Sequence, residues 1–159
     1  MAKADESKVI FNTMCQMMES IKWKYKTEER SPDYIISTSA VGEDLSMHLN
    51  IHVDTERQVM YLKSPMPFKT NPDKTEDMVK AVTIANWDML NGCFEMDMDD
   101  GYVAFKMVIP FMQSMISTEV CRYMIMLSCN MIDKFNDKLK AINDGEMTLA
   151  QFKQFVKGN

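Results

Sequence analysis

The stretch that decides the fold is 93–110, which reads CFEMDMDDGYVAFKMVIP. On each side of Asp100-Gly101 apolar residues recur at every second position, which is typical of β-strands with one buried face. Asp-Gly suits the two central positions of a type I′ turn, because both require positive φ angles. The stretch therefore predicts an antiparallel hairpin over Cys93–Pro110.

A two-residue turn at Asp100-Gly101 also predicts the register of this hairpin. Glu95 then lies directly across from Lys106, where opposite charges attract. On the other face the predicted apolar pairs are Met98–Val103, Met96–Phe105 and Phe94–Met107.

Three further strands are expected before the hairpin. Leu45–Val53 alternates between apolar and polar side chains, and Tyr34–Val41 and Arg57–Lys63 flank it. Ser64–Pro67 contains two prolines and is expected to end the third strand. A short loop through Thr55 and Glu56 predicts the pairs Val53–Gln58, Ile51–Met60 and Leu49–Leu62.

Periodic apolar residues predict four helices, over 5–21, 74–90, 117–143 and onward from Thr148. Asp73 is the expected N-cap of the second helix and Ser117 that of the third. Thr148 and Gln151 have the spacing of a capping box at the start of the last helix.

The predicted order is α-β-β-β-α-β-β-α-α, with a further short strand expected near Tyr25. Strands in antiparallel hairpins with helices grouped around them indicate an α+β fold with a twisted antiparallel sheet. No linker or repeat divides the chain, so residues 1–159 are expected to form a single domain.

The predicted helix over 117–143 is apolar on two sides. One row contains Val120, Met124, Leu127, Met131, Phe135, Leu139 and Ile142, and the second contains Cys121, Ile125, Ser128 and Ile132. A helix with two apolar rows is buried on two sides. Either another helix or a second subunit must cover the second row, so a homodimer is one expectation.

Composition excludes several classes of protein. The 159 residues include 18 Lys and Arg against 23 Asp and Glu, a net charge of −5 that argues against nucleic-acid binding. The purest apolar run, Tyr123–Leu127, is far shorter than the roughly 18 residues of a membrane span. The cysteines have no zinc-ligand spacing and are expected to be buried free thiols of a cytoplasmic protein; they are Cys15, Cys93, Cys121 and Cys129.

The residues that carry chemistry do not indicate an enzyme. His48 and His52 lie on one predicted strand about 13 Å apart, too far to share a metal ion. Neither a serine-nucleophile elbow nor a glycine-rich phosphate loop occurs. We therefore expect no catalytic residue, no metal and no cofactor.

The second half of the chain resembles the YbjN family. The residues that carry the resemblance are Ala85-Asn86, Gly92–Asp97, Asp100-Gly101, Phe105-Lys106, Ser117 and Met131–Phe135. The resemblance is firm over 78–156, and it departs at Asp137-Lys138, where the family often has Pro-Gly. Members are labelled bacterial sensory transduction regulators, and their fold is similar to that of type III secretion chaperones, which are usually dimeric and bind segments of other proteins.

The resemblance implies a non-enzymatic regulatory or chaperone-like module of the bacterial cytoplasm, which binds segments of an unidentified partner protein. The alternative is a small-molecule-binding protein or small hydrolase that uses the polar sheet face. For partner binding we expect that same face, where tyrosines could act as rigid anchors, unless a helical groove is left uncovered. The candidate residues are His48, Asn50, His52, Tyr61 and Tyr102.

Overall fold

The structure is a computed structural model that describes residues 2–87 and 89–158. Within these residues the helices are α1 (Lys3–Ser20), α2 (Thr75–Asn86), α3 (Thr118–Asn143) and α4 (Leu149–Lys157), with a short 3₁₀ turn, Pro72–Lys74, before α2. The strands are β1 (Tyr25–Arg30), β2 (Asp33–Val41), β3 (Ser46–Asp54), β4 (Val59–Lys69), β5 (Cys93–Met96) and β6 (Tyr102–Pro110).

The strands form one antiparallel sheet in the order β1-β2-β3-β4-β6-β5. This confirms the predicted α+β fold. The additional short strand expected near Tyr25 is β1, and with it the sheet has six strands.

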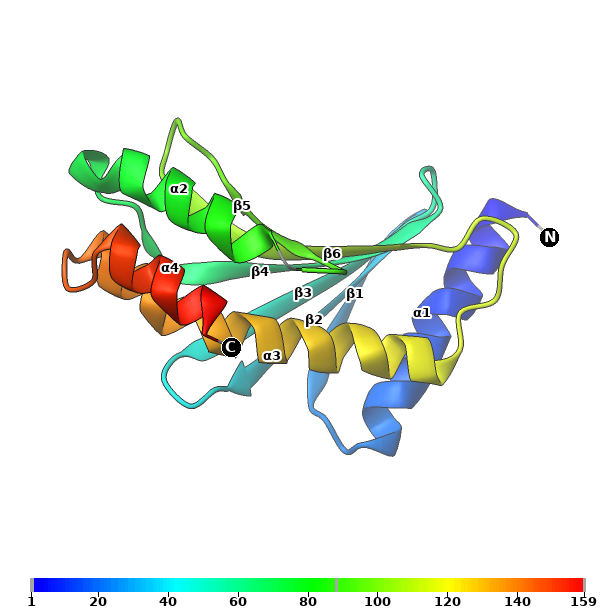
Figure 1. The fold of residues 1–159 in the computed structure, drawn as a ribbon. Helices are drawn as coiled ribbons and strands as arrows, with labels where there is room; N and C mark the ends of the chain where they lie inside the picture. Colours follow the sequence, from blue (N-terminus) through cyan, green and yellow to red (C-terminus); the bar gives the residue numbers. More distant parts are fainter. Residues whose placement is uncertain (1, 88, 159) are drawn as a thin grey trace.

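The hydrophobic core lies between one face of the sheet and the helices. Alternate strand side chains are buried on that inner face, while most of their neighbours on the outer face are half-buried or exposed. The inner residues include Ile36, Leu49, Ile51, Met60, Leu62, Phe94, Phe105 and Met107. Figure 1 shows α3 spanning the molecule, with α1 at its N-terminal end and α4 at its C-terminal end. No described helix is long and apolar enough to cross a membrane.

The long helix α3 begins where the sequence predicts, because the Ser117 side chain accepts a hydrogen bond from the Val120 backbone. Its second apolar row is entirely buried within the chain. Ser128 Oγ lies 3.8 Å from Met107 Sδ on β6, and α1 also packs against α3. Of the two predicted ways to cover this second row, the structure shows burial within the chain, so a second subunit is not needed to cover it.

Both predicted hairpin registers are wrong by two residues, although the side chains within the strands lie on the predicted faces. Met98, predicted to pair with Val103 on the buried face, lies instead in the loop after β5 and is exposed. Phe94 pairs with Phe105 instead of Met107, and Ile51 pairs with Leu62 instead of Met60. The reason is loop length. Four residues, 55–58, connect β3 and β4, and four residues, 98–101, follow the last hydrogen-bonded pair of the other hairpin, Asp97 and Tyr102; in each loop only the last residue has a positive φ. A type I′ turn would need two such residues.

The same shift changes the predicted contact between Glu95 and Lys106. The residue directly across from Glu95 is Ala104, and Lys106 reaches the Glu95 carboxylate from a diagonal position at 3.2 Å. The ion pair is therefore present without the direct cross-strand pairing.

Strand β4 does not end at Ser64–Pro67 as expected. It continues to Lys69, with an irregularity between Pro65 and Lys69. Its pairing with β3 stops at Lys63, so the prolines lie where β4 has only β6 as a neighbour. Proline is tolerated there because an edge strand needs no N–H donor on its open side.

Helix α2 is shorter than the predicted 74–90. It begins at Thr75 without the expected Asp73 cap and ends at Asn86. The Asn86 side chain bonds both backbone groups of Phe94, donating to the carbonyl and accepting from the N–H at 2.8 Å each. Helix α4, by contrast, has the predicted capping box of Thr148 and Gln151.

Candidate functional site

Four of the five predicted site residues lie together on the outer face of the sheet. His48, Asn50 and His52 are on β3, and Tyr61 on β4 pairs directly with His52. The His52 and Tyr61 rings stack in parallel with centroids 4.7 Å apart. Burial is the main cause that lowers the pKa of His52, and the positive charge of Arg30 acts in the same direction.

Hydrogen bonds to β2 hold the other two polar side chains of this face. Ser39 Oγ lies 2.9 Å from His48 Nδ1, and Ser37 Oγ donates to Asn50 Oδ1 at 3.2 Å. These contacts arise from the register of β2 and β3, in which each serine lies directly across from its partner. The face is thus an ordered polar surface.

Tyr102 lies apart from the other four residues. It begins β6, six residues along the strand from Val108, which pairs with Tyr61. Lys63 Nζ lies 5.1 Å from the centre of the Tyr102 ring, and the same amine contacts Glu95 at 2.6 Å. The structure therefore does not join all five predicted residues into one site.

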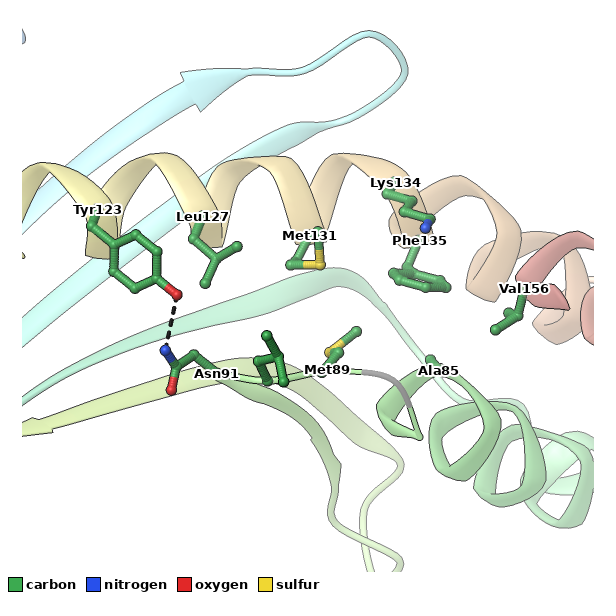
Figure 2. Close-up of a pocket in the computed structure, with 10 residues that line it drawn as sticks. Ala85, Met89, Asn91, Tyr123, Leu127, Met131, Lys134, Phe135 and Val156 are labelled. Carbon is green, nitrogen blue, oxygen red and sulfur yellow. Dashed lines mark hydrogen bonds between the residues drawn. The ribbon is translucent and has the colours of Figure 1, made fainter. Parts of the chain in front are cut away.

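A second candidate site is an apolar groove on the helical side of the molecule. It lies between α3, the C-terminal end of α2 with the segment that follows, and α4, and its volume is about 280 Å³. Figure 2 shows the side chains of α3 facing those of the segment after α2. The groove is lined by Ala85, Met89, Leu90, Asn91, Tyr123, Leu127, Met131, Lys134, Phe135 and Val156.

Large apolar side chains stay exposed in and around this groove. Leu90 is 98% exposed, and Trp87, just after α2, is 85% exposed. Tyr123 on α3, which also lines the groove, is 45% exposed. A contiguous exposed apolar surface on a monomer commonly marks an interaction site.

Polar groups lie at both ends of the groove. At one end Asn91 Nδ2 donates to the Tyr123 hydroxyl at 2.9 Å, as drawn in Figure 2. At the other end Lys134 Nζ lies 5.3 Å from the centre of the Phe135 ring. The groove thus combines an apolar floor with a cation and an amide at its ends.

The position of this groove could not be read from the sequence. The predicted helix over 74–90 would have carried Met89 in its buried stripe. Because α2 ends at Asn86, Met89 and Leu90 instead belong to an irregular segment that lines the groove. The part of α3 that lines the groove is the middle of its first apolar row, at the half-buried Leu127 and Met131, and not the second row.

The cysteines differ in burial more than predicted. Cys121 and Cys129 are buried free thiols, and burial is the main cause that raises the pKa of Cys121 to about 12 and that of Cys129 to about 11. Cys15 is half-buried, whereas Cys93 is exposed, contrary to expectation. Among the described residues, no cluster of His, Cys, Asp and Glu could hold a metal ion.

Together the sheet order and the helices define an α+β protein with a six-stranded antiparallel sheet. Among solved structures, the chain is similar to the crystal structure of YbjN, a proposed transcription regulator from E. coli. The TM-score is 0.57 over 82% of this chain and 89% of that chain, at 12% sequence identity. Comparison of the sequence with family models and with curated proteins gives no match. The structural likeness confirms the predicted fold.

Proposed function

We propose that this chain is a non-enzymatic regulatory module that binds apolar segments of a partner protein in the groove between α2, α3 and α4. The observation that carries the proposal is the exposure of Leu90 and Tyr123, which line this groove. Full burial of a large apolar side chain is favourable by about 1.5–3 kcal/mol relative to leaving it in water. A partner segment that covers them recovers part of this free energy.

The composition supports a cytoplasmic location and a partner other than nucleic acid. Free thiols without disulfides are typical of a reducing cytoplasm, and we place the protein in the bacterial cytoplasm. The net charge of −5 disfavours nucleic acid as the partner. A protein segment with apolar anchors fits the groove better than a polyanion.

The alternative function, a small-molecule-binding protein or hydrolase on the polar sheet face, has one supporting observation. Ser39 and His48 are hydrogen-bonded, as a nucleophile and its general base would be. Within the described residues, however, no carboxylate is bonded to this histidine to orient it as in a catalytic triad. The apolar groove therefore supports the proposed function better.

A peptide selection tests the groove. Random twelve-residue peptides displayed on phage would be selected on the wild-type protein, and the affinity of the selected peptides then measured for two variants. We expect Leu90→Lys to weaken binding at least tenfold, because it places an ammonium group in the apolar groove. Leu90 is almost fully exposed, so the variant should remain folded.

The matched control is Met98→Lys, which makes the same kind of change on the loop between β5 and β6, outside the groove. Met98 is 63% exposed, and its replacement should leave peptide affinity unchanged. Failure to select any binding peptide, or equal affinity for both variants, would contradict the proposal.

A further inference from the structure

The last residues of β6 form an open edge of the sheet. Strand β5 pairs with β6 only as far as Cys93, which lies across from Lys106. Immediately before Cys93 the chain turns away at Gly92, whose φ is +78°. Strand β6 nevertheless continues to Pro110 and pairs there with β4. Among the described residues, 107–110 therefore have a neighbouring strand on one side only.

The hydrogen bonds to β4 show which backbone groups point toward the open side. Phe111 donates its N–H to the Gln58 carbonyl at 2.9 Å, which extends the β4–β6 ladder by one pair. Along an antiparallel strand the backbone groups of successive residues point alternately to the two neighbours. Ile109 and Met107 consequently point to β4, and the N–H and C=O of Val108 point away from it.

The hydrogen bonds to β5 lead to the same assignment. At the end of the hairpin the Asp97 N–H donates to the Tyr102 carbonyl at 2.8 Å, so the backbone of Tyr102 points toward β5. Counting by twos along β6, Val108 points in this direction as well. No described residue bonds the backbone of Val108 there, and its side chain is 46% exposed.

The open edge adjoins the apolar groove. Helix α3 crosses β6 at Met107, whose sulfur lies 3.8 Å from the Ser128 hydroxyl, and Leu127 beside it lines the groove. Asn91 bonds Tyr123 in the groove and lies two residues before Cys93, the residue of β5 that pairs with Lys106 of β6. An unpaired donor and acceptor thus lie next to an apolar surface.

We propose that an extended segment of the partner protein adds to the sheet at Val108 as a short antiparallel strand. The paired residue would exchange hydrogen bonds with Val108 and point its side chain to the outer face. The residues before and after it would point inward, toward Tyr123 and Leu127, so the segment should read apolar-polar-apolar. This inference rests on the proposed function and names the form in which the partner binds.

A second copy of this chain fits the edge poorly. Antiparallel self-pairing centred on Val108 would place the second copy's Pro110 across from Lys106, where Cys93 already lies. Proline also lacks the N–H that such a ladder requires. A peptide strand of three or four residues, which matches the length of 107–110, is therefore the occupant that we infer.

Nuclear magnetic resonance on the labelled protein tests this directly. The probe is the acetylated and amidated peptide Ser-Val-Thr-Val-Ser. Without peptide, the Val108 amide should exchange with solvent at least tenfold faster than the amides of Met107 and Ile109, which bond to β4. With peptide, the exchange of the Val108 amide should slow at least tenfold.

Two N-methylated peptides provide a matched pair. Methylation at the central threonine removes the donor that faces Val108 and should weaken binding at least tenfold. Methylation at a valine removes an N–H that points away from β6 and should be tolerated. A peptide bound as a helix would not show this alternation.

A pair of protein variants tests the same hydrogen bond, between the Val108 N–H and the peptide, from the side of the protein. Val108→Pro removes the outward N–H without breaking a bond to β4, and it should weaken peptide binding tenfold. Val108→Ala retains the N–H and should bind within a few-fold of wild type. If Val108→Pro does not fold, the methylated peptides decide the question.

Three results would overturn the inference. The first is no binding of the probe peptide, and the second is binding that leaves the Val108 amide unprotected. The third is protection of this amide that rises with protein concentration in the absence of peptide, which would assign the edge to a second copy. The Leu90→Lys result with selected peptides is independent of these outcomes, so the proposed function can survive their failure.

Discussion

At the scale of the residue, Asn86 shows how one side chain completes a sheet edge. The outward-pointing N–H and C=O of Phe94 would otherwise be unpaired beside a side chain that is only 2% exposed. The amide group of asparagine presents one donor and one acceptor, as a neighbouring strand would. Thus the end of α2 is held against β5 by two hydrogen bonds.

We expect Asn86→Ala to lower the free energy of unfolding by about 2 kcal/mol, because two hydrogen bonds are lost and two backbone groups are left without a protein partner. Urea denaturation measures the change. Asn91→Ala is the control, since it removes one exposed hydrogen bond to Tyr123 and should cost less than about 1 kcal/mol. Equal losses for the two variants would refute this role of Asn86.

At the scale of the element, the hairpin loops decide the register of the sheet. The loops 55–58 and 98–101 each end on a residue with positive φ, which is Gln58 in the first and Gly101 in the second. Asp54 accepts a hydrogen bond from the Arg57 backbone, and Asp97 accepts one from the Asp99 backbone. Side-chain bonds within the loop therefore stabilise a longer connection than a two-residue turn.

Gly101→Ala should destabilise the hairpin by more than the roughly 1–2 kcal/mol of a left-handed alanine alone. Its Cβ would lie 2.9 Å from the Thr70 carbonyl oxygen, so the backbone would also have to shift. Gly145→Ala is a matched control, because Gly145 has a similar φ of +77° but meets only the Lys74 side chain at 3.6 Å. Thermal unfolding should show the larger loss for Gly101→Ala, and the reverse order would disprove the argument.

At the scale of the whole molecule, the helices cover the inner face of the sheet incompletely. Helix α1 lies at one end of α3 and α4 at the other, and α2 stops before it covers the middle of α3 (Figure 1). What stays uncovered is the groove with Leu127 and Met131, and beside it the open edge of β6. Both features that we assign to partner binding thus arise where elements end early.

A homodimer remains our prediction for the free protein, and it now rests on the resemblance, since the second apolar row of α3 is buried within one chain. Light scattering coupled to size-exclusion chromatography should give about twice the mass of 18.4 kDa. A monomer mass throughout the micromolar range would contradict the prediction. Leu90→Lys should leave the mass unchanged if the groove is free to bind a partner.

The local pattern of the sequence determined the elements of this fold. Alternation at Leu45–Val53 assigned the buried face of β3, and the caps at Ser117 and Thr148 located the starts of α3 and α4, because these signals depend on near neighbours in the chain. Of the candidate site, the sequence grouped His48, Asn50, His52 and Tyr61 correctly on one face. The YbjN resemblance, carried by turn and core residues, also matched the observed fold.

Only the tertiary structure decided the registers, the end of α2 and the groove. A two-residue shift keeps every side chain on its face, so alternation cannot distinguish the two registers. The end of α2 depends on the bond between Asn86 and Phe94, and the open edge depends on where β5 stops relative to β6. These features arise from contacts between distant segments, and the sequence pattern reports on neighbouring residues alone.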